Sequence, residues 1–230
     1  MTHKGQVRGQ TAADGHHISN YHVTPSDIDP SIARKGGLVL IQEIFGVTDH
    51  IKALCDGFAA DGYEVIAPAL FDRMEPNFAV GYAPEDIERA RALAAQVDWD
   101  GVVADIATSV TLLAPRGPVF ITGYCFGGSV AWLAACRVPG LAAASGYYGR
   151  LTVQFINETP KCPIILHFGD KDQTIPMEDV RRIEAAHPTV PIYTYDAGHG
   201  FNSDRRTDYD ADCAALARSR TLDLFAAHGG

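Results

Sequence analysis

The sequence lacks any long run of apolar residues, although hydrophobic residues make up 47% of its 230 positions. A helix that crosses a bilayer needs about 20 consecutive apolar residues, and no run of that length occurs. The first residues are polar and do not form the apolar centre of a signal peptide. We therefore expect a soluble, cytoplasmic protein that does not associate with a membrane.

Basic residues are also scarce. The chain has 19 Lys and Arg against 28 Asp and Glu, which gives a formal net charge of -9. No segment gathers Lys or Arg densely enough to neutralise a phosphate backbone. Nucleic acid is therefore excluded as an expected partner.

Cysteine is a third scarce residue type, with five in the chain. An odd number without closely spaced pairs argues against a disulfide framework and against a zinc ribbon. We expect no metal site, buried thiols at most of these positions, and a chemical role for one of them. The five are Cys55, Cys125, Cys136, Cys162 and Cys213.

What the chain does contain is a regular alternation of short apolar runs with longer amphipathic segments. Several of the runs are rich in Val and Ile without strict alternation, as strands buried on both faces are. Strands are predicted at residues 37–41, 64–67, 118–122, 141–147, 163–168 and 191–195.

The segments between these runs have the apolar spacing of helices. Helices are predicted at residues 49–60, 84–96, 101–114, 127–135, 176–187 and 208–227. Strands that alternate with helices predict an α/β fold, with a mostly parallel central sheet covered by helices on both faces. The predicted core-facing stripe of the last helix consists of Ala214, Leu216, Ala217, Leu222 and Phe225.

Residues 1–36 differ from the rest of the chain, since they contain Pro25 and Pro30 and show little sustained periodicity. They are interpreted as an antiparallel hairpin and loop at one edge of the sheet. The chain shows no internal repeat and no linker between two composition types. A single domain over residues 1–230 is therefore predicted.

The most specific motif is Gly-Tyr-Cys-Phe-Gly at residues 123–127, which follows an apolar strand and opens a predicted helix. Strand, sharp turn and helix form the context of the nucleophile-elbow motif, here with Cys125 in the place of serine. The flanking glycines let strand and helix approach a strained backbone. The free N–H groups of the helix N-terminus favour a thiolate. The motif predicts that Cys125 is a nucleophile.

A nucleophile of this kind needs a base and an acid, which follow it along the chain in the order acid, then histidine. Asp170 and Asp172 both come directly after a predicted strand, where α/β sheets build their sites. Asp172 is preferred because its Gly-x-x-Asp spacing from Gly169 resembles the acid turn of enzymes with a nucleophile elbow. His199 lies between two glycines just past the last predicted strand, and a neutral imidazole there is suited to accept a thiol proton.

Glu43 directly follows the first buried strand, in the segment Gln-Glu-Ile-Phe-Gly at residues 42–46. In folds with a nucleophile elbow, this segment supplies the second N–H group of the oxyanion hole. From the residues alone, Glu43 is equally well explained as a helix-capping or solvated loop acid.

Together these segments resemble the dienelactone hydrolase family, also called carboxymethylenebutenolidase, of the α/β-hydrolase superfamily. The resemblance extends from about residue 20 to the terminal helix, and the joint match is far more specific than any single motif. It implies a Cys-His-Asp triad and no cofactor. The implied catalytic residues are Cys125 as nucleophile, His199 as base, Asp172 as its orienting acid and Glu43 as activator of the nucleophile, with the N–H groups of Ile44 and Phe126 as oxyanion hole.

Family members that use dienelactone hold the substrate carboxylate with arginines. The resemblance places Arg73 as the first, whereas Ser203 stands where the second is expected, with Arg205 and Arg206 close behind. This departure leaves it open whether dienelactone is the substrate. The candidate substrate-binding residues are Arg73, Phe45, Tyr147, Tyr148 and Ser203.

The predicted function is that of a carboxylic-ester or lactone hydrolase that forms a thioester acyl-enzyme, acting as a monomer or small homo-oligomer on a small-molecule substrate. Two alternatives remain. One is a ligand-binding homologue without turnover. The other is a glutamine-amidotransferase-like enzyme, whose histidine is normally followed two residues later by Glu, whereas Phe201 stands at that position here.

Overall fold

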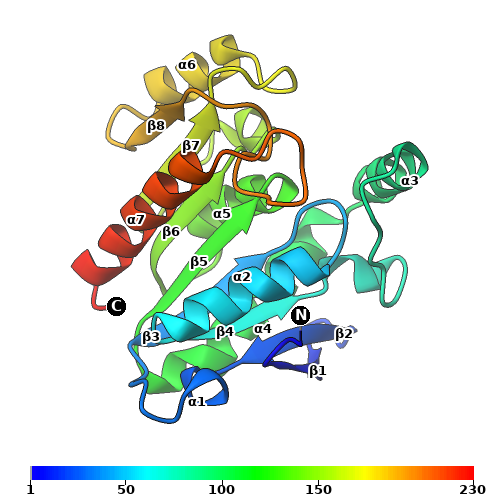
Figure 1. The fold of residues 1–230 in the computed structure, drawn as a ribbon, viewed down its shortest axis with the longest axis vertical. Helices are drawn as coiled ribbons and strands as arrows, with labels where there is room; N and C mark the ends of the chain where they lie inside the picture. Colours follow the sequence, from blue (N-terminus) through cyan, green and yellow to red (C-terminus); the bar gives the residue numbers. More distant parts are fainter. Residues whose placement is uncertain (1) are drawn as a thin grey trace.

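A single eight-stranded sheet forms the centre of the computed structural model, which describes residues 2–230 (Figure 1). The strands lie in the order β1-β2-β4-β3-β5-β6-β7-β8. Their bounds are β1 Gln6–Thr11, β2 His17–Val23, β3 Gly36–Ile41, β4 Tyr63–Pro68, β5 Val119–Tyr124, β6 Leu141–Tyr147, β7 Ile164–Gly169 and β8 Ile192–Tyr195.

Six of the strands, from β3 to β8, run parallel to one another. The N-terminal hairpin differs, because β1 and β2 pair antiparallel and β2 adds antiparallel to β4 at the sheet edge. Every residue of β3, β4, β5 and β7 is buried. Burial on both faces explains why these segments read as continuous apolar runs.

Helices cover both faces of the sheet. In Figure 1, α2 and α7 lie in front of it, while α4 and α5 lie behind. The longer helices are α2 Asp49–Ala60, α3 Pro84–Ala94, α4 Trp99–Leu113, α5 Phe126–Arg137, α6 Met177–Ala186 and α7 Ala211–Ala227; the short ones are α1 Pro25–Ile28, η1 Leu70–Arg73, η2 Ala114–Arg116 and η3 Thr152–Phe155.

The six predicted strands and six predicted helices are all present, and their observed ends lie within three residues of the predicted ones. The mostly parallel α/β architecture is confirmed. One detail of the last helix is wrong: Leu216 is 48% exposed, whereas Ala217 and Phe225 are buried. The predicted stripe was too broad, because α7 contacts the sheet along a narrower line than its apolar residues span.

The order of the strands fixes where a site forms. From β3 the chain adds β4 on one side and then returns to place β5 on the other side of β3. Ligand sites in such sheets lie outside the carboxyl ends of the strands at this reversal. The segments that leave β3, β5, β7 and β8 contain Glu43, Cys125, Asp172 and His199, respectively.

Within residues 2–230, no helix combines the length and the apolar character that crossing a membrane requires.

Candidate active site

Cys125 lies in the sharp turn between β5 and α5. Its backbone has φ 56°, a left-handed conformation that costs energy for a residue with a Cβ atom. The turn is held by the Cys125 N–H, which donates to the carbonyl of Tyr147 at 3.0 Å. A Cβ at Gly127 would lie 2.5 Å from the carbonyl oxygen of Ile41, so α5 starts close against the end of β3. This packing places the half-buried Cys125 just beyond the carboxyl end of β5, a central strand of the sheet.

His199 and Asp172 complete a chain of contacts to the thiol. Nε2 of His199 lies 3.2 Å from Sγ of Cys125, and Nδ1 lies 2.6 Å from Oδ2 of Asp172. The Asp172 side chain is fully buried, while that of His199 is 11% exposed. A carboxylate oxygen only accepts hydrogen bonds, so Nδ1 holds the proton and Nε2 faces the sulfur.

The other oxygen of Asp172 is held by the turn that follows it. Oδ1 accepts hydrogen bonds from Thr174 N at 2.7 Å, Thr174 Oγ1 at 2.7 Å and Ile175 N at 3.1 Å. The Thr174 hydroxyl also lies 3.1 Å from Nδ1 of His199. Thr174 was not predicted from the sequence, although Asp-x-Thr in a turn is a typical pattern for such bonds. Asp170, the alternative acid, is exposed.

The ionisation of the pair follows from these contacts. Burial alone would raise the pKa of Asp172, but hydrogen bonds from His199 and Thr174 outweigh it and lower that pKa. Burial favours neutral His199, yet the charge of Cys125 and the hydrogen bond with Asp172 prevail and raise the His199 pKa to about 10. A protonated imidazole places a positive charge 3.2 Å from the sulfur of Cys125.

Glu43 is 1% exposed, so it is not a solvated loop acid, and it is not the cap of α2, because Thr48 stands at that position. Its Oε2 lies 3.4 Å from the hydroxyl of Tyr82, and its Oε1 has no hydrogen-bond partner in the described part of the chain. Tyr82 was not identified from sequence, because it stands in an irregular segment before α3 with no recognisable motif. A buried carboxylate with an unused acceptor is costly and marks a candidate functional group.

The proposed oxyanion hole consists of the backbone N–H groups of Ile44 and Phe126. Phe126 is the first residue of α5, and Ile44 lies in the turn after β3. Across residues 2–230, neither N–H donates to another group of the protein. Two unengaged N–H groups from the segments on either side of Cys125 agree with binding of an anionic oxygen.

The remaining predicted pocket residues differ in their surroundings. Tyr147 is part of the core, because it is fully buried and its hydroxyl bonds to Thr221 at 2.7 Å. Tyr148 is also fully buried, but its ring lies 5.2 Å from that of His199 and its hydroxyl has no partner among residues 2–230. Phe45 packs its ring against Tyr82 at 4.6 Å, and Ser203 is completely buried.

A cavity of about 550 Å³ lies between the start of α2 and the segment that precedes α3. Tyr82 forms part of its wall and is the residue that also contacts Glu43. Lys52 and Arg205 line the same cavity. Arg206 instead packs against the backbone next to His199, since a Cβ on Gly200 would lie 2.9 Å from its Cδ.

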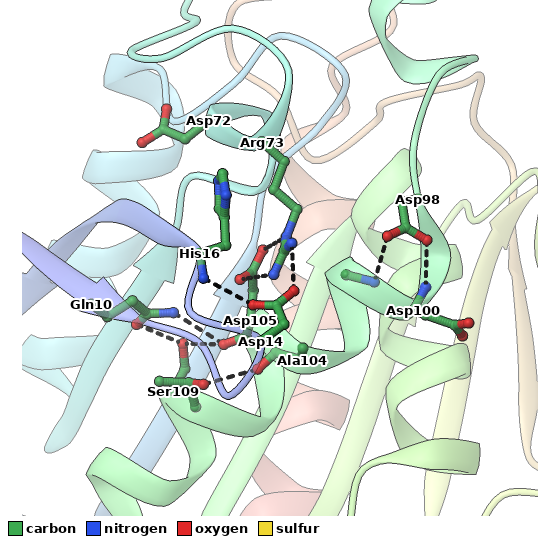
Figure 2. A network of polar contacts seen from close by, with 12 residues as sticks. Gln10, Asp14, His16, Asp72, Arg73, Asp98, Asp100, Ala104, Asp105 and Ser109 are labelled. Carbon is green, nitrogen blue, oxygen red and sulfur yellow. Dashed lines mark hydrogen bonds and ion pairs between the residues drawn. The ribbon is translucent and has the colours of Figure 1, made fainter.

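Arg73 does not reach this cavity. Its guanidinium donates to both oxygens of Asp105, at 2.7 and 2.8 Å, and to Asp14 at 2.8 Å, as Figure 2 shows. The side chain of Asp105 is fully buried, and Asp14 comes from the turn between β1 and β2. Arg73 is therefore not available to hold a substrate anion, and its prediction as a clamp is corrected here to a structural ion pair.

The buried ion pair between Arg73 and Asp105 should contribute to the stability of the fold. Replacing Arg73 by methionine leaves the Asp105 carboxylate buried without its partner, so the free energy of unfolding should fall by about 3–5 kcal/mol. Arg89→Met is the matched control, because Arg89 is 57% exposed and pairs with the exposed Glu75, and its effect should stay below about 1 kcal/mol. Urea unfolding measures both. Equal effects of the two variants would contradict the structural role of Arg73.

Among residues 2–230, no group of three or more His, Cys, Asp or Glu side chains is arranged to hold a metal ion. Three comparisons with known proteins bear on this site. The family model described as "Dienelactone hydrolase family" matches residues 18–229. The chain belongs to the dienelactone hydrolase family.

Relatives in this family cover most of the chain. An Escherichia coli K12 protein named "Putative carboxymethylenebutenolidase" is 34% identical over 240 residues, covering 95% of this chain and 85% of the relative. "Carboxymethylenebutenolidase 1" of Cupriavidus pinatubonensis is 30% identical over 201 residues, covering 82% of this chain and 85% of the relative.

The fold is shared with solved members of the family. The crystal structure titled "Putative Dienelactone Hydrolase" from Klebsiella pneumoniae superposes with a TM-score of 0.81 at 29% identity, covering 96% of this chain and 99% of the other. The α/β-hydrolase fold expected from the sequence is thereby confirmed. Family membership also removes the glutamine-amidotransferase alternative.

Proposed function

We propose that this protein hydrolyses a small ester or lactone through a covalent thioester on Cys125. The observation that supports this most directly is the unbroken chain of contacts from Asp172 through His199 to Cys125, at 2.6 and 3.2 Å. Nucleophile and base within hydrogen-bond reach, with a third group orienting the base, are the signature of nucleophilic catalysis. The names of the relatives agree with a lactone substrate.

In the proposed acylation, His199 is protonated at Nε2 beside the deprotonated sulfur of Cys125, and that sulfur attacks the substrate carbonyl carbon. The carbonyl oxygen becomes negatively charged and is held by the N–H groups of Ile44 and Phe126. The bond from carbon to the leaving oxygen then breaks, and His199 gives its proton to that oxygen. The acyl group remains on Cys125 as a thioester.

Deacylation repeats these steps with water. A water molecule loses a proton to His199 and attacks the thioester carbon, after which the carbon–sulfur bond breaks and the sulfur leaves beside the protonated His199. Asp172 keeps the imidazole in the tautomer that has Nε2 free and stabilises its positive form. We assign to the buried Glu43, with its unused oxygen Oε1, the role of a second proton acceptor for Cys125.

The cavity that Tyr82 lines is the basis for proposing that the substrate is an anion. Arg205, Lys52 and Asp49 line it, and Lys52 pairs with Asp49 at 3.4 Å. Tyr82 also lines the cavity, and its hydroxyl lies 3.4 Å from Glu43. An arginine there can form paired, charge-assisted hydrogen bonds to a carboxylate. We propose that Arg205, rather than Arg73, holds the acidic group of the substrate.

Hydrolysis rates on two substrates test this function. Wild-type protein should hydrolyse both dienelactone, which has a carboxylate, and a neutral aryl ester of similar size. Arg205→Ala should raise KM for dienelactone by about tenfold, the value of a hydrogen bond to a charged group, and leave the neutral ester unaffected. Arg181→Ala, at an exposed position on α6, is the control for loss of one positive charge.

The outcomes separate the parts of the proposal. If wild type hydrolyses both esters and Arg205→Ala behaves as wild type, the anion-binding role of Arg205 is wrong and the hydrolase function stands. If neither ester is hydrolysed while dienelactone binds, the ligand-binding homologue is the better description.

A further inference from the structure

Thr174 bridges the two residues that prepare Cys125 for reaction. Its hydroxyl lies 2.7 Å from Oδ1 of Asp172 and 3.1 Å from Nδ1 of His199. Nδ1 in turn lies 2.6 Å from Oδ2 of Asp172. The three side chains therefore close a small ring of polar contacts, in which the hydroxyl touches both partners of the ion pair.

The directions of these bonds follow from the chemistry of each group. The carboxylate of Asp172 accepts only, so the single hydroxyl proton of Thr174 is donated to Oδ1. The proton on Nδ1 of His199 points to Oδ2 and lies within reach of the lone pairs on the Thr174 oxygen. The hydroxyl thus donates to the carboxylate and accepts a share of the imidazole proton, and both contacts stabilise the charged form of the pair.

Thr174 is exposed to solvent, so its hydroxyl could bond to water instead. Burial therefore does not force the hydroxyl toward Asp172 and His199. The backbone N–H groups of Thr174 and Ile175 already hold Oδ1 in place. Loss of the hydroxyl alone therefore leaves the turn intact and removes only the contact that spans Asp172 and His199.

We infer that Thr174 is a positioning residue, whose hydroxyl fixes the orientation of Asp172 and His199 and so favours the reactive form of Cys125. This inference rests on the catalytic triad of the proposed function. It assigns no contact between Thr174 and the substrate.

The test compares Thr174→Val, which keeps the shape and removes the hydroxyl, with Thr174→Ser, which restores it. The first readout is the pH dependence of iodoacetamide alkylation at Cys125, followed by mass spectrometry of its peptide. Without the hydroxyl the imidazolium is less stabilised, so the thiolate should form at higher pH and the midpoint should shift upward. Serine should return the midpoint to that of wild type.

The second readout is steady-state hydrolysis of the neutral aryl ester. Thr174→Val should lower kcat roughly tenfold with KM unchanged, as expected for loss of a hydrogen bond to a charged group, and serine should restore it. Thr111→Val, at an exposed position on α4, is the matched control and should change neither readout.

Alkylation does not need turnover, so the inference can fail separately from the proposed function. If the alkylation profile of Thr174→Val superimposes on that of wild type, the positioning role is overturned. A change in KM alone would also overturn it, because it would indicate contact with substrate. Absence of wild-type hydrolysis, together with a shifted profile, would overturn the hydrolase function and leave the positioning role supported.

Discussion

Replacing Cys125 by alanine is expected to lower the rate of ester hydrolysis by about four to six orders of magnitude. The sulfur lies 3.2 Å from Nε2 of His199, and the other half-buried thiols lie outside this arrangement. Without the sulfur no thioester forms. Binding and the N–H groups of Ile44 and Phe126 then leave only a small residual rate above that in water.

Two measurements check this expectation. Initial rates on an aryl ester compare wild type with Cys125→Ala, and acid quenching of wild type during turnover should yield a Cys125 peptide heavier by the acyl group. Cys162→Ala is the matched control, because Cys162 is half-buried and burial raises its pKa to about 11, so it should not react. Full activity in Cys125→Ala, or an acyl group on another residue, would refute the proposed mechanism.

Replacing Gly123 by alanine is expected to destabilise the fold severely. A Cβ at this position would lie 2.0 Å from the carbonyl oxygen of Gly127 and 2.4 Å from its carbon. Both are backbone atoms in the first turn of α5, which cannot yield as a flexible side chain would. Either the turn at Cys125 opens or α5 moves off the sheet, and we expect a loss of about 4 kcal/mol or more.

Urea unfolding measures this loss, with Gly9→Ala as the matched control. Gly9 lies in β1, where a Cβ would meet nothing within 4 Å, so its effect should stay within about 0.5 kcal/mol. Gly123→Ala should also lose hydrolysis in any fraction that folds, because the Cys125 turn is displaced. Equal stability of the two variants would show that the elbow tolerates a methyl group and that its tight packing is not required.

Local patterns in the sequence were enough to predict most of the architecture. A strand buried on both faces must be apolar throughout, and a covering helix must repeat its apolar residues at helical spacing, so both leave signals that need no knowledge of the partner. The strand at Leu141–Tyr147 and the helix at Asp49–Ala60 were predicted with the bounds that the structure has. Leu216 was placed wrongly because its exposure depends on how α7 meets the sheet.

Residues in tight, chemically restricted turns were also predictable. Cys125, Asp172 and His199 each follow a strand in a glycine-containing turn, and the structure brings their side chains into contact. Tyr82 was missed because it stands in an irregular segment, and Thr174 because the Asp-x-Thr pattern of its turn gives no sign that it also reaches His199. Each matters through the residue that it touches, and that contact depends on the path of the chain between them.

The sequence by itself determined the order of strands and helices along the chain, the nucleophile elbow and the positions of the candidate acid and base. Only the tertiary structure decided the partners of long polar side chains. Arg73 binds Asp105 and Asp14, which are 32 and 59 positions away, whereas Arg205 lies at the cavity beside Tyr82. The physical reason is that backbone conformation follows local periodicity and sterics, while the partner of a flexible charged side chain is set by which distant segments the fold brings within hydrogen-bond distance.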